Sequence, residues 1–183
     1  KVMTTGEGGM ITTNNNKLFK KMKSYRQYGF KDSNQTFFDK KSSNYKMNEF
    51  SAALGLTELK RVSKRIKKRN QIAKFYQKFF HKSSKFNLLK ASKHSYCNHY
   101  KQIFISKFSR EKIKKYLLKF NIPLTGGVYN TPVHKQPVYK KELSKYKLPN
   151  TDYFCKHHFC PPCYPELTMS DIKKICKIID RFN

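Results

Sequence analysis

A lysine and a glycine-rich segment stand together at the start of the chain. Lys1 is followed, after two residues, by Thr4-Thr5-Gly6-Glu7-Gly8-Gly9. A lysine amine can add to an aldehyde and can later carry a proton between two carbon atoms. Glycine permits a tight turn or a close approach of the backbone to a ligand. Because Val2–Thr5 and Met10–Thr13 are rich in β-forming residues, the spacing favours a β-hairpin, and a ligand-holding loop beside Lys1 is the alternative.

Two further segments carry side chains suited to polar ligands. Asn44-Tyr45-Lys46-Met47 precedes a long helical pattern, and an amide donor near a helix start suits an anion. His134 lies in the turn-rich segment Pro132-Val133-His134-Lys135-Gln136-Pro137. By residue type alone, Asn44 is typical of a turn before a helix, and His134 is typical of a structural turn.

Cysteines and histidines near the C-terminus raise the question of a metal site. The candidate ligands are Cys155, His157, His158, Cys160 and Cys163. The last two have the Cys-x2-Cys spacing of half a zinc site, but no second well-spaced pair accompanies them, so we expect no metal. The five cysteines are odd in number and no secretory signal is visible, which favours free thiols in a reducing cytoplasm.

The elements that must position these side chains begin with a helix. Leu18, Met22 and Tyr25 have helical spacing after an Asn that can cap the helix, and Gly29 can end it. Residues 30–43 have no clear period, so we expect a long loop there.

A longer helical pattern follows, with Asn48 as its candidate cap. Apolar residues at helical spacing run over residues 50–66, and a second stretch over residues 72–80 continues them without an internal proline. One long helix is therefore possible. Residues 82–95 are polar and irregular, which indicates a domain boundary.

This boundary divides the chain into residues 1–81 and residues 82–183. The order of elements in the second part fits a small α/β domain. The expected elements are a strand within residues 96–106, a helix capped by Ser109, a short strand toward Tyr129, a helix from Thr151 to about His158, a short or edge strand within residues 160–164, and a last helix opened by Thr168.

The chain is strongly basic, with 40 Lys and Arg residues against 11 Asp and Glu residues and a net charge of +29. Such a balance suggests nucleic acid or an anionic membrane. However, the lysines are spread along the whole chain, and arginine, the residue favoured for bidentate contacts, is scarce. An AT-rich codon bias explains the composition at least as well. No apolar run approaches the roughly 20 residues that span a bilayer.

The segment from Lys1 to Gly9 resembles the cofactor-lysine segment of the DegT–StrS family of nucleotide-sugar aminotransferases. Residues 44–56, the His134 turn and Tyr164-Pro165-Glu166-Leu167-Thr168 resemble further motifs of that family, so the resemblance covers nearly the whole chain. It implies a pyridoxal-phosphate (PLP) enzyme of fold type I. The expected fold class is α/β, with part of the large domain and the interdomain helix in residues 1–81 and the small C-terminal domain in residues 82–183.

The resemblance also implies roles for four residues. Lys1 matches the lysine that forms the Schiff base with PLP. Asn44 matches an amide that binds the PLP phosphate of the neighbouring subunit. His134 matches a histidine near the nucleotide-sugar substrate. Lys46 stands at a substrate-binding position where Arg is usual, and a lysine lacks the bidentate geometry of an arginine.

The implied activity is transfer of an amino group, with glutamate as the donor, to a nucleotide-linked keto-sugar for a polysaccharide or glycoconjugate. A homodimer with shared sites is expected. Because no initiator Met precedes Lys1, we expect a C-terminal part of a longer protein. The alternatives are a non-catalytic fragment or relative, a sugar dehydratase of the same fold, in which His replaces the lysine, and a basic nucleic-acid-binding module.

Overall fold

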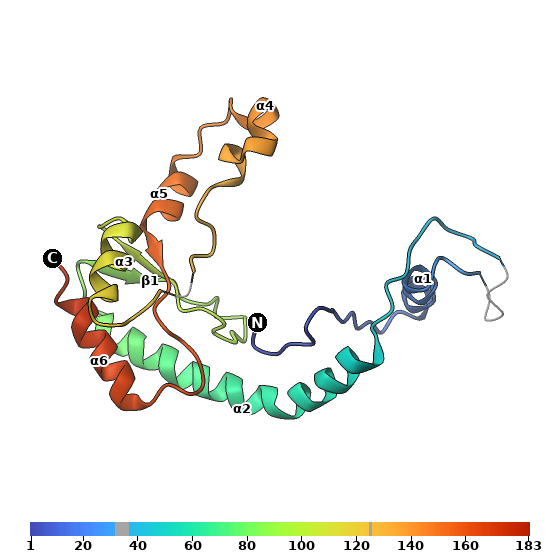
Figure 1. The fold of residues 1–183 in the computed structure, drawn as a ribbon, viewed down its shortest axis with the longest axis horizontal. Helices are drawn as coiled ribbons and strands as arrows, with labels where there is room; N and C mark the ends of the chain where they lie inside the picture. The colour runs from blue at the N-terminus through green and yellow to red at the C-terminus, as the bar shows by residue number, and fades with distance from the viewer. Residues whose placement is uncertain (32–36, 125) are drawn as a thin grey trace. The chain divides into compact units, whose positions relative to one another are not determined.

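The computed structural model describes residues 1–31, 37–124 and 126–183 (Figure 1). They form two compact units, one of Lys1 with residues 3–62 and one of Val2 with residues 63–183. The expected division at residues 81 and 82 concerns the domains of a larger enzyme and stays a prediction.

The glycine-rich segment of the first unit is a loop. Residues 1–13 contain no strand, so the hairpin that the spacing favours is wrong. That this loop holds a ligand stays a prediction. The reason lies in local hydrogen bonding, because threonine hydroxyls bond to the backbone of their own segment. The N–H of Gly6 donates to Thr4 Oγ1 at 3.1 Å, and Thr5 Oγ1 donates to the carbonyl of Glu7 at 3.1 Å. Gly6 has a φ of 77°, which suits glycine.

Helix α1 covers Asn16–Arg26, and its predicted cap is confirmed, since Asn15 Oδ1 accepts from the N–H of Leu18 at 3.0 Å. The expected long loop follows, and its two ends pair with each other, so that residues 27–44 form an arm. Isolated bridges join Gln27 to Asn44 and Phe30 to Phe38. The middle of that loop, residues 32–36, lies outside the described residues.

Gly29 explains how the two sides of this arm come together. Its φ is 78°, and a Cβ atom there would lie 2.1 Å from the carbonyl oxygen of Lys40. No side chain fits such an approach, so glycine is required for the arm to close.

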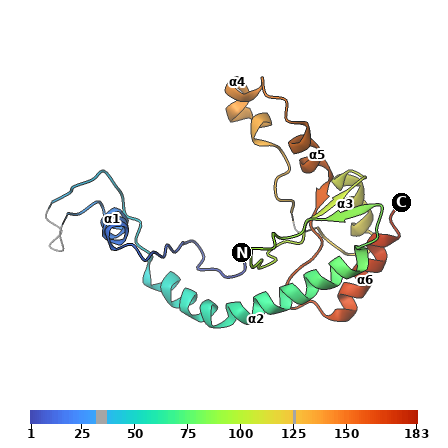
Figure 2. The ribbon, with the colours of Figure 1, turned by 180° about the vertical axis from the view of Figure 1, so that it is seen from behind.

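Helix α2 covers Glu49–Phe80 as one element of 32 residues, which confirms the single long helix (Figures 1 and 2). Asn48 acts as predicted at its start, since Asn48 Oδ1 accepts from the N–H of Ser51 at 2.8 Å. The residues of α2 before position 63 belong to the first unit and the later ones to the second.

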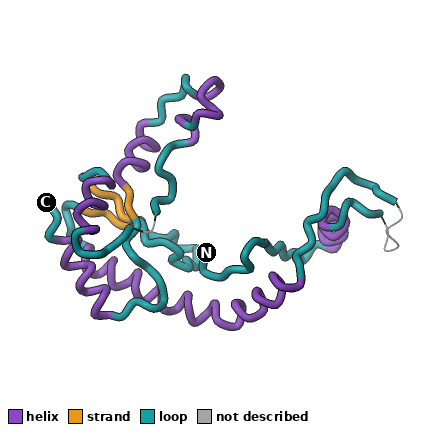
Figure 3. Tube along the Cα trace, in the orientation of Figure 1, coloured by secondary structure: helices purple, strands orange, loops and turns teal. Residues whose placement is uncertain are grey.

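The second unit is built on a three-stranded antiparallel sheet in the order β1-β2-β3 (Figure 3). The strands are β1 (Phe86–Leu88), β2 (Phe104–Ser106) and β3 (His158–Phe159). Strand β1 lies in the stretch expected to be irregular, because its alternate residues Phe86 and Leu88 are buried while Asn87 is exposed. Only the end of the strand expected over residues 96–106 forms. The described residues near Tyr129 and residues 160–164 contain no strand.

Helices and short helical turns complete this unit. The expectation that Thr151 caps a helix is wrong, since the helix begins two residues earlier with a proline at its first position, where the missing N–H costs nothing. The elements are α3 (Arg110–Leu118), the 3-10 turns η1 (Val133–Lys135) and η2 (Pro137–Tyr139), α4 (Lys140–Leu143), α5 (Pro149–His157) and α6 (Met169–Asp180).

The core of the second unit is aromatic at its centre. Tyr76 and Phe80 of α2 pack edge-on against Phe104 of β2, with ring centroids 5.6 Å and 5.3 Å away, and Phe104 also packs against Phe159 of β3. Such pairs add roughly 0.5–1.5 kcal/mol each beyond the area that they bury. Apolar residues of α3 and α6 extend this core.

The proline-rich segment after β3 is held by α2. Tyr76 Oη donates to the carbonyl of Pro162 at 3.0 Å, and Arg69 Nη1 donates to the carbonyl of Cys163. Prolines lack an N–H, so this segment cannot form a complete backbone ladder with a neighbouring strand. Its carbonyls accept hydrogen bonds from side chains instead.

The described residues of the first unit form no apolar core of their own. Among its described residues from position 3 to 62, only Gly29 and Glu58 are buried. Large apolar side chains are exposed instead, with Phe50 91% and Met10 82% exposed. Large exposed apolar patches mark interaction sites in soluble proteins, and these side chains are candidates for such a patch.

We expect limited proteolysis of the 183-residue chain to cut residues 3–62 well before residues 63–183. Cleavage follows local opening, and a segment without buried apolar contacts opens at little cost. Mass spectrometry of the surviving fragments checks this. Survival of residues 3–62 while residues 63–183 are cut would contradict it.

Helix α6 offers a test in the second unit, because Thr168 and Asp171 form a capping box. Thr168 Oγ1 accepts from the N–H of Asp171 at 3.1 Å, and Asp171 Oδ2 accepts from the N–H of Thr168 at 3.1 Å. We expect Thr168→Ala to lower the free energy of unfolding by about 1 kcal/mol in urea. Ser170→Ala, at an exposed position in the same turn, is the control and should change it by less than about 0.5 kcal/mol. Equal effects would contradict the capping role.

Candidate active site

The glycine-rich loop packs against the start of α2 within the first unit. A Cβ atom at Gly8 would lie 2.5 Å from Thr5 Oγ1 and 3.0 Å from Met47 Cε. A Cβ atom at Gly55 would lie 3.1 Å from Thr5 Cγ2. These glycines therefore allow the loop that follows Lys1 to approach both the segment before α2 and the first turns of α2. The structure brings the Lys1 segment and the Asn44–Met47 segment into one neighbourhood.

Asn44 is oriented by its own local turn. Its Oδ1 accepts from the N–H of Lys46 at 3.2 Å, while its backbone pairs with Gln27. The amide oxygen is thereby used, and the Nδ2 group has no hydrogen-bond partner among the residues described here, so it remains a donor. The Nζ atom of Lys46 lies 5.3 Å from the ring centroid of Tyr28, within the range of a cation–π contact.

Each of these groups has a definite chemical character, and their convergence on one ligand stays a prediction. Lys1 contributes an exposed primary amine, Asn44 an amide donor and Lys46 an ammonium group. An amine adds to an aldehyde, and amide and ammonium donors bind an anion. The set therefore fits a molecule that carries both an aldehyde and a phosphate.

His134 belongs to the second unit and is 7% exposed. It is the middle residue of η1, the turn that follows Pro132. Its Nε2 is 3.3 Å from Oδ1 of Asp152 in α5. Both residues line a cavity of about 820 Å³, together with Lys135, Tyr146 and Lys147 among others. Because Lys1, Asn44 and Lys46 belong to the other unit, their joint site with His134 stays a prediction.

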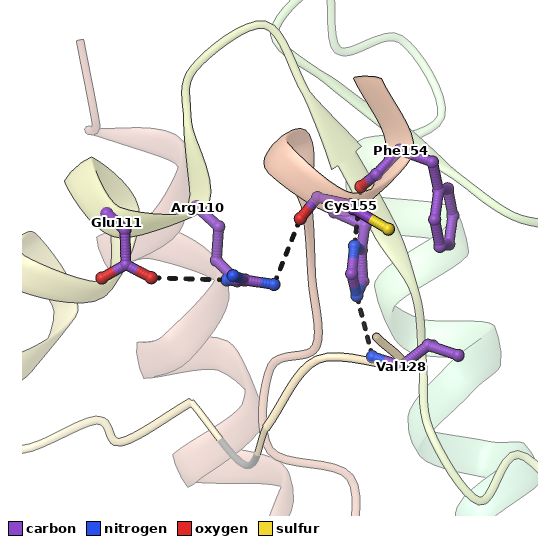
Figure 4. Close-up of polar contacts among 6 residues, drawn as sticks. Arg110, Glu111, Val128, Phe154 and Cys155 are labelled. Atoms are coloured by element: carbon purple, nitrogen blue, oxygen red, sulfur yellow. Dashed lines mark hydrogen bonds and ion pairs between the residues drawn. The ribbon is translucent and has the colours of Figure 1, made fainter. Parts of the chain in front are cut away.

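The segment that leads to His134 is held by a buried histidine, His158 (Figure 4). His158 is fully buried, and its Nδ1 lies 2.7 Å from the carbonyl of Phe154, to which it must donate. Its Nε2 accepts from the N–H of Val128 at 2.8 Å. These two bonds together require the neutral imidazole with the proton on Nδ1.

Gly127 lies beside this histidine because nothing larger fits. A Cβ atom there would lie 2.7 Å from His158 Nε2 and 2.9 Å from Arg110 Nη1. Lys101 Nζ donates to the carbonyl of Gly127 at 2.9 Å. Arg110 Nη1 donates to the carbonyl of Cys155 at 3.2 Å (Figure 4). The backbone before the His134 turn is thus fixed to the sheet and to α5.

Sequence reasoning considered His158 only as a metal ligand and missed this role. The signal that could have shown it is the spacing of Phe154 and His158, one helical turn apart, since their rings stack with centroids 4.4 Å apart. No comparable signal marks Asp152 as the neighbour of His134, because only the tertiary fold joins η1 to α5.

The cysteines near His158 are buried thiols. Burial raises the pKa of Cys163 to about 11 and that of Cys176 to about 12, which disfavours the thiolate that a zinc site needs. The thiol of Cys163 donates to the carbonyl of His99. In the described part of the chain, no group of three or more His, Cys, Asp or Glu side chains is arranged to bind a metal ion.

His158 should make stability depend on pH. Burial lowers its pKa below the ordinary value of 6.5, and the charges of Arg110 and Lys101 lower it further. The folded chain therefore binds fewer protons than the unfolded chain, so stability is complete above pH 6.5 and falls as the pH drops through the lowered pKa.

We expect His158→Gln to be less stable than the parent chain at pH 8 but to lose less further stability between pH 7 and pH 5. Glutamine can accept from Val128 without gaining a proton. Urea unfolding across this pH range is the measurement, and the exposed His94→Gln variant is the control. An unchanged pH dependence in His158→Gln would refute the role of His158.

Comparison with known proteins shows the family of the chain. The profile of the DegT/DnrJ/EryC1/StrS aminotransferase family matches residues 1–180, and the chain belongs to that family. It is 31% identical over 177 residues to a UDP-4-amino-4,6-dideoxy-N-acetyl-beta-L-altrosamine transaminase of Campylobacter jejuni, covering 94% of this chain and 47% of that protein. It is 27% identical over 184 residues to a GDP-perosamine synthase of Escherichia coli O157:H7, covering 100% of this chain and 49% of that protein. The chain thus spans about half the length of these relatives.

Solved structures of sugar aminotransferases share the fold. PseC of Helicobacter pylori, an aminotransferase involved in the biosynthesis of pseudoaminic acid, superposes with a TM-score of 0.80 at 23% identity. CalS13 of Micromonospora echinospora, a sugar aminotransferase, has a TM-score of 0.84 at 19% identity. Each match covers 98% of this chain and 49% of the other. The α/β fold-type-I class expected from the sequence is confirmed.

Proposed function

We propose that this chain carries the catalytic lysine of a PLP-dependent aminotransferase that acts on a nucleotide-linked keto-sugar. The observation that carries the proposal is the packing of the loop after Lys1 against Met47 and Gly55, in a chain that belongs to a sugar aminotransferase family. The transaminases and synthases that it resembles are named for UDP-linked and GDP-linked sugars, which supports this substrate class.

Lys1 has two tasks in this proposal. Its amine holds the cofactor covalently between turnovers. As a released amine it removes a proton from, or returns one to, the reacting carbon of the substrate. When bound, PLP supplies the aldehyde that receives the amino group and a ring that accepts electrons. Asn44 donates from Nδ2 to the phosphate, and Lys46 contributes a positive charge to the substrate.

The surroundings of these residues support a shared site. The first unit has no buried apolar side chain among its described residues, so it needs a covering surface. We propose that a homodimer and the remaining half of the enzyme provide that surface, with Asn44 serving the neighbouring subunit. In this proposal residues 1–81 complete the large domain and residues 82–183 form the small one.

Glutamate is the proposed amino donor and the cytoplasm the proposed compartment. All five cysteines are free thiols, which supports a reducing environment. In the described ranges of the chain, no helix has the length and apolar character needed to cross a membrane. The 183-residue chain alone is expected to bind PLP poorly and not to transaminate.

In the protein expressed from its complete gene, we expect borohydride to fix PLP to Lys1. Lys1→Arg should abolish the attachment and reduce transamination by at least about a thousandfold, since arginine cannot replace the amine as nucleophile or base. Peptide mapping locates the label, and Lys17→Arg, which changes another exposed lysine of the first unit, is the matched control. Attachment at a different lysine would overturn the assignment.

A further inference from the structure

Asp152 lies where it can determine which nitrogen of His134 carries the proton. Its Oδ1 is 3.3 Å from His134 Nε2 and 2.8 Å from Lys135 Nζ. The Oδ1 atom and the Nε2 atom are both buried, and neither has an aligned hydrogen-bond partner among the residues that the structure describes. The two ion pairs with Asp152 are therefore the polar contacts that these atoms have.

Lys135 favours the ionised form of Asp152. Its ammonium nitrogen lies 2.8 Å from Oδ1 and lowers the pKa of Asp152 below the ordinary range. Asp152 is consequently ionised at neutral pH, and an ionised carboxylate can only accept.

A neutral imidazole has one N–H and one lone pair, so its orientation toward a carboxylate has two alternatives. If Nε2 held the lone pair, two acceptors would face each other at 3.3 Å in a buried place, which costs free energy. With the proton on Nε2 the contact is attractive. The lone pair then belongs to Nδ1, for which the described residues provide no hydrogen-bond partner.

We propose that Asp152 is a positioning residue that holds His134 as the Nε2–H tautomer and leaves Nδ1 as the nitrogen that accepts from a ligand. The ligand is of the hydrogen-bond donor class, such as a hydroxyl group of the nucleotide-linked sugar, and this assignment rests on the proposed function. The assignment of the tautomer does not depend on the proposed function.

Long-range proton–nitrogen NMR of the 15N-labelled 183-residue chain at pH 8 tests the tautomer directly. We expect the proton of His134 on Nε2 and, as an internal reference, the proton of His158 on Nδ1. His134→Gln assigns the signal by its loss. A wild-type His134 with its proton on Nδ1 would overturn the proposal without any variant.

Two variants separate positioning from mere proximity. Asp152→Asn can donate to Nε2, so we expect the proton of His134 to move toward Nδ1, as in other histidines that lose a carboxylate partner. Lys135→Gln keeps the carboxylate, and the tautomer should stay. The unchanged His158 signal reports that each variant is folded. An unchanged His134 tautomer in folded Asp152→Asn would refute the role of Asp152.

In the complete protein, Asp152→Asn should raise KM for the nucleotide-sugar about tenfold, the effect of one lost hydrogen bond, and leave KM for the amino donor unchanged. An increase for both substrates alike would contradict the assignment to the sugar. A wild-type protein without transaminase activity would refute the proposed function, whereas the NMR result would stand by itself.

Discussion

The packing of α2 against the small sheet is the interaction on which the rest of the structure depends. Tyr76 and Phe80 meet Phe104, and through it Phe159, in one aromatic cluster. This packing fixes β3 in place, and β3 begins with His158, the residue that binds the backbone of Val128. An aromatic cluster that contains none of the proposed site residues thereby determines where the His134 segment starts. Polar contacts then refine a position that apolar burial has already chosen.

The two units differ in how much of their apolar surface they bury. Residues 63–183 bury their apolar side chains among themselves, while the described residues of 3–62 leave theirs exposed. The proposed catalytic lysine belongs to the unit without a core. In the proposed homodimer, chain segments beyond the unit would hold this site in shape, so catalysis and assembly would depend on the same surface. Stability would then be inseparable from association.

Several elements follow from local rules, and the sequence predicts them well. Asn15, Asn48 and Thr168 cap the helices expected from them, because a capping side chain bonds within three residues of its own position. The resemblance to the family predicted the fold class. Strand β1 and the loop of residues 1–13 were assigned wrongly, because a short strand depends on its partner strand and a glycine turn depends on what its flanking residues can bond.

By itself, the sequence determined the two helices of residues 16–26 and 49–80, the last helix, the family and the candidate residues Lys1, Asn44, Lys46 and His134. Caps, periodicity and motifs are patterns of neighbouring positions. Only the tertiary structure decided what surrounds those residues. Asp152 meets His134, and His158 meets Val128, across segments with no shared pattern. The physical reason is that a hydrogen bond between distant segments forms only after apolar burial has brought them together, and no local propensity records that outcome.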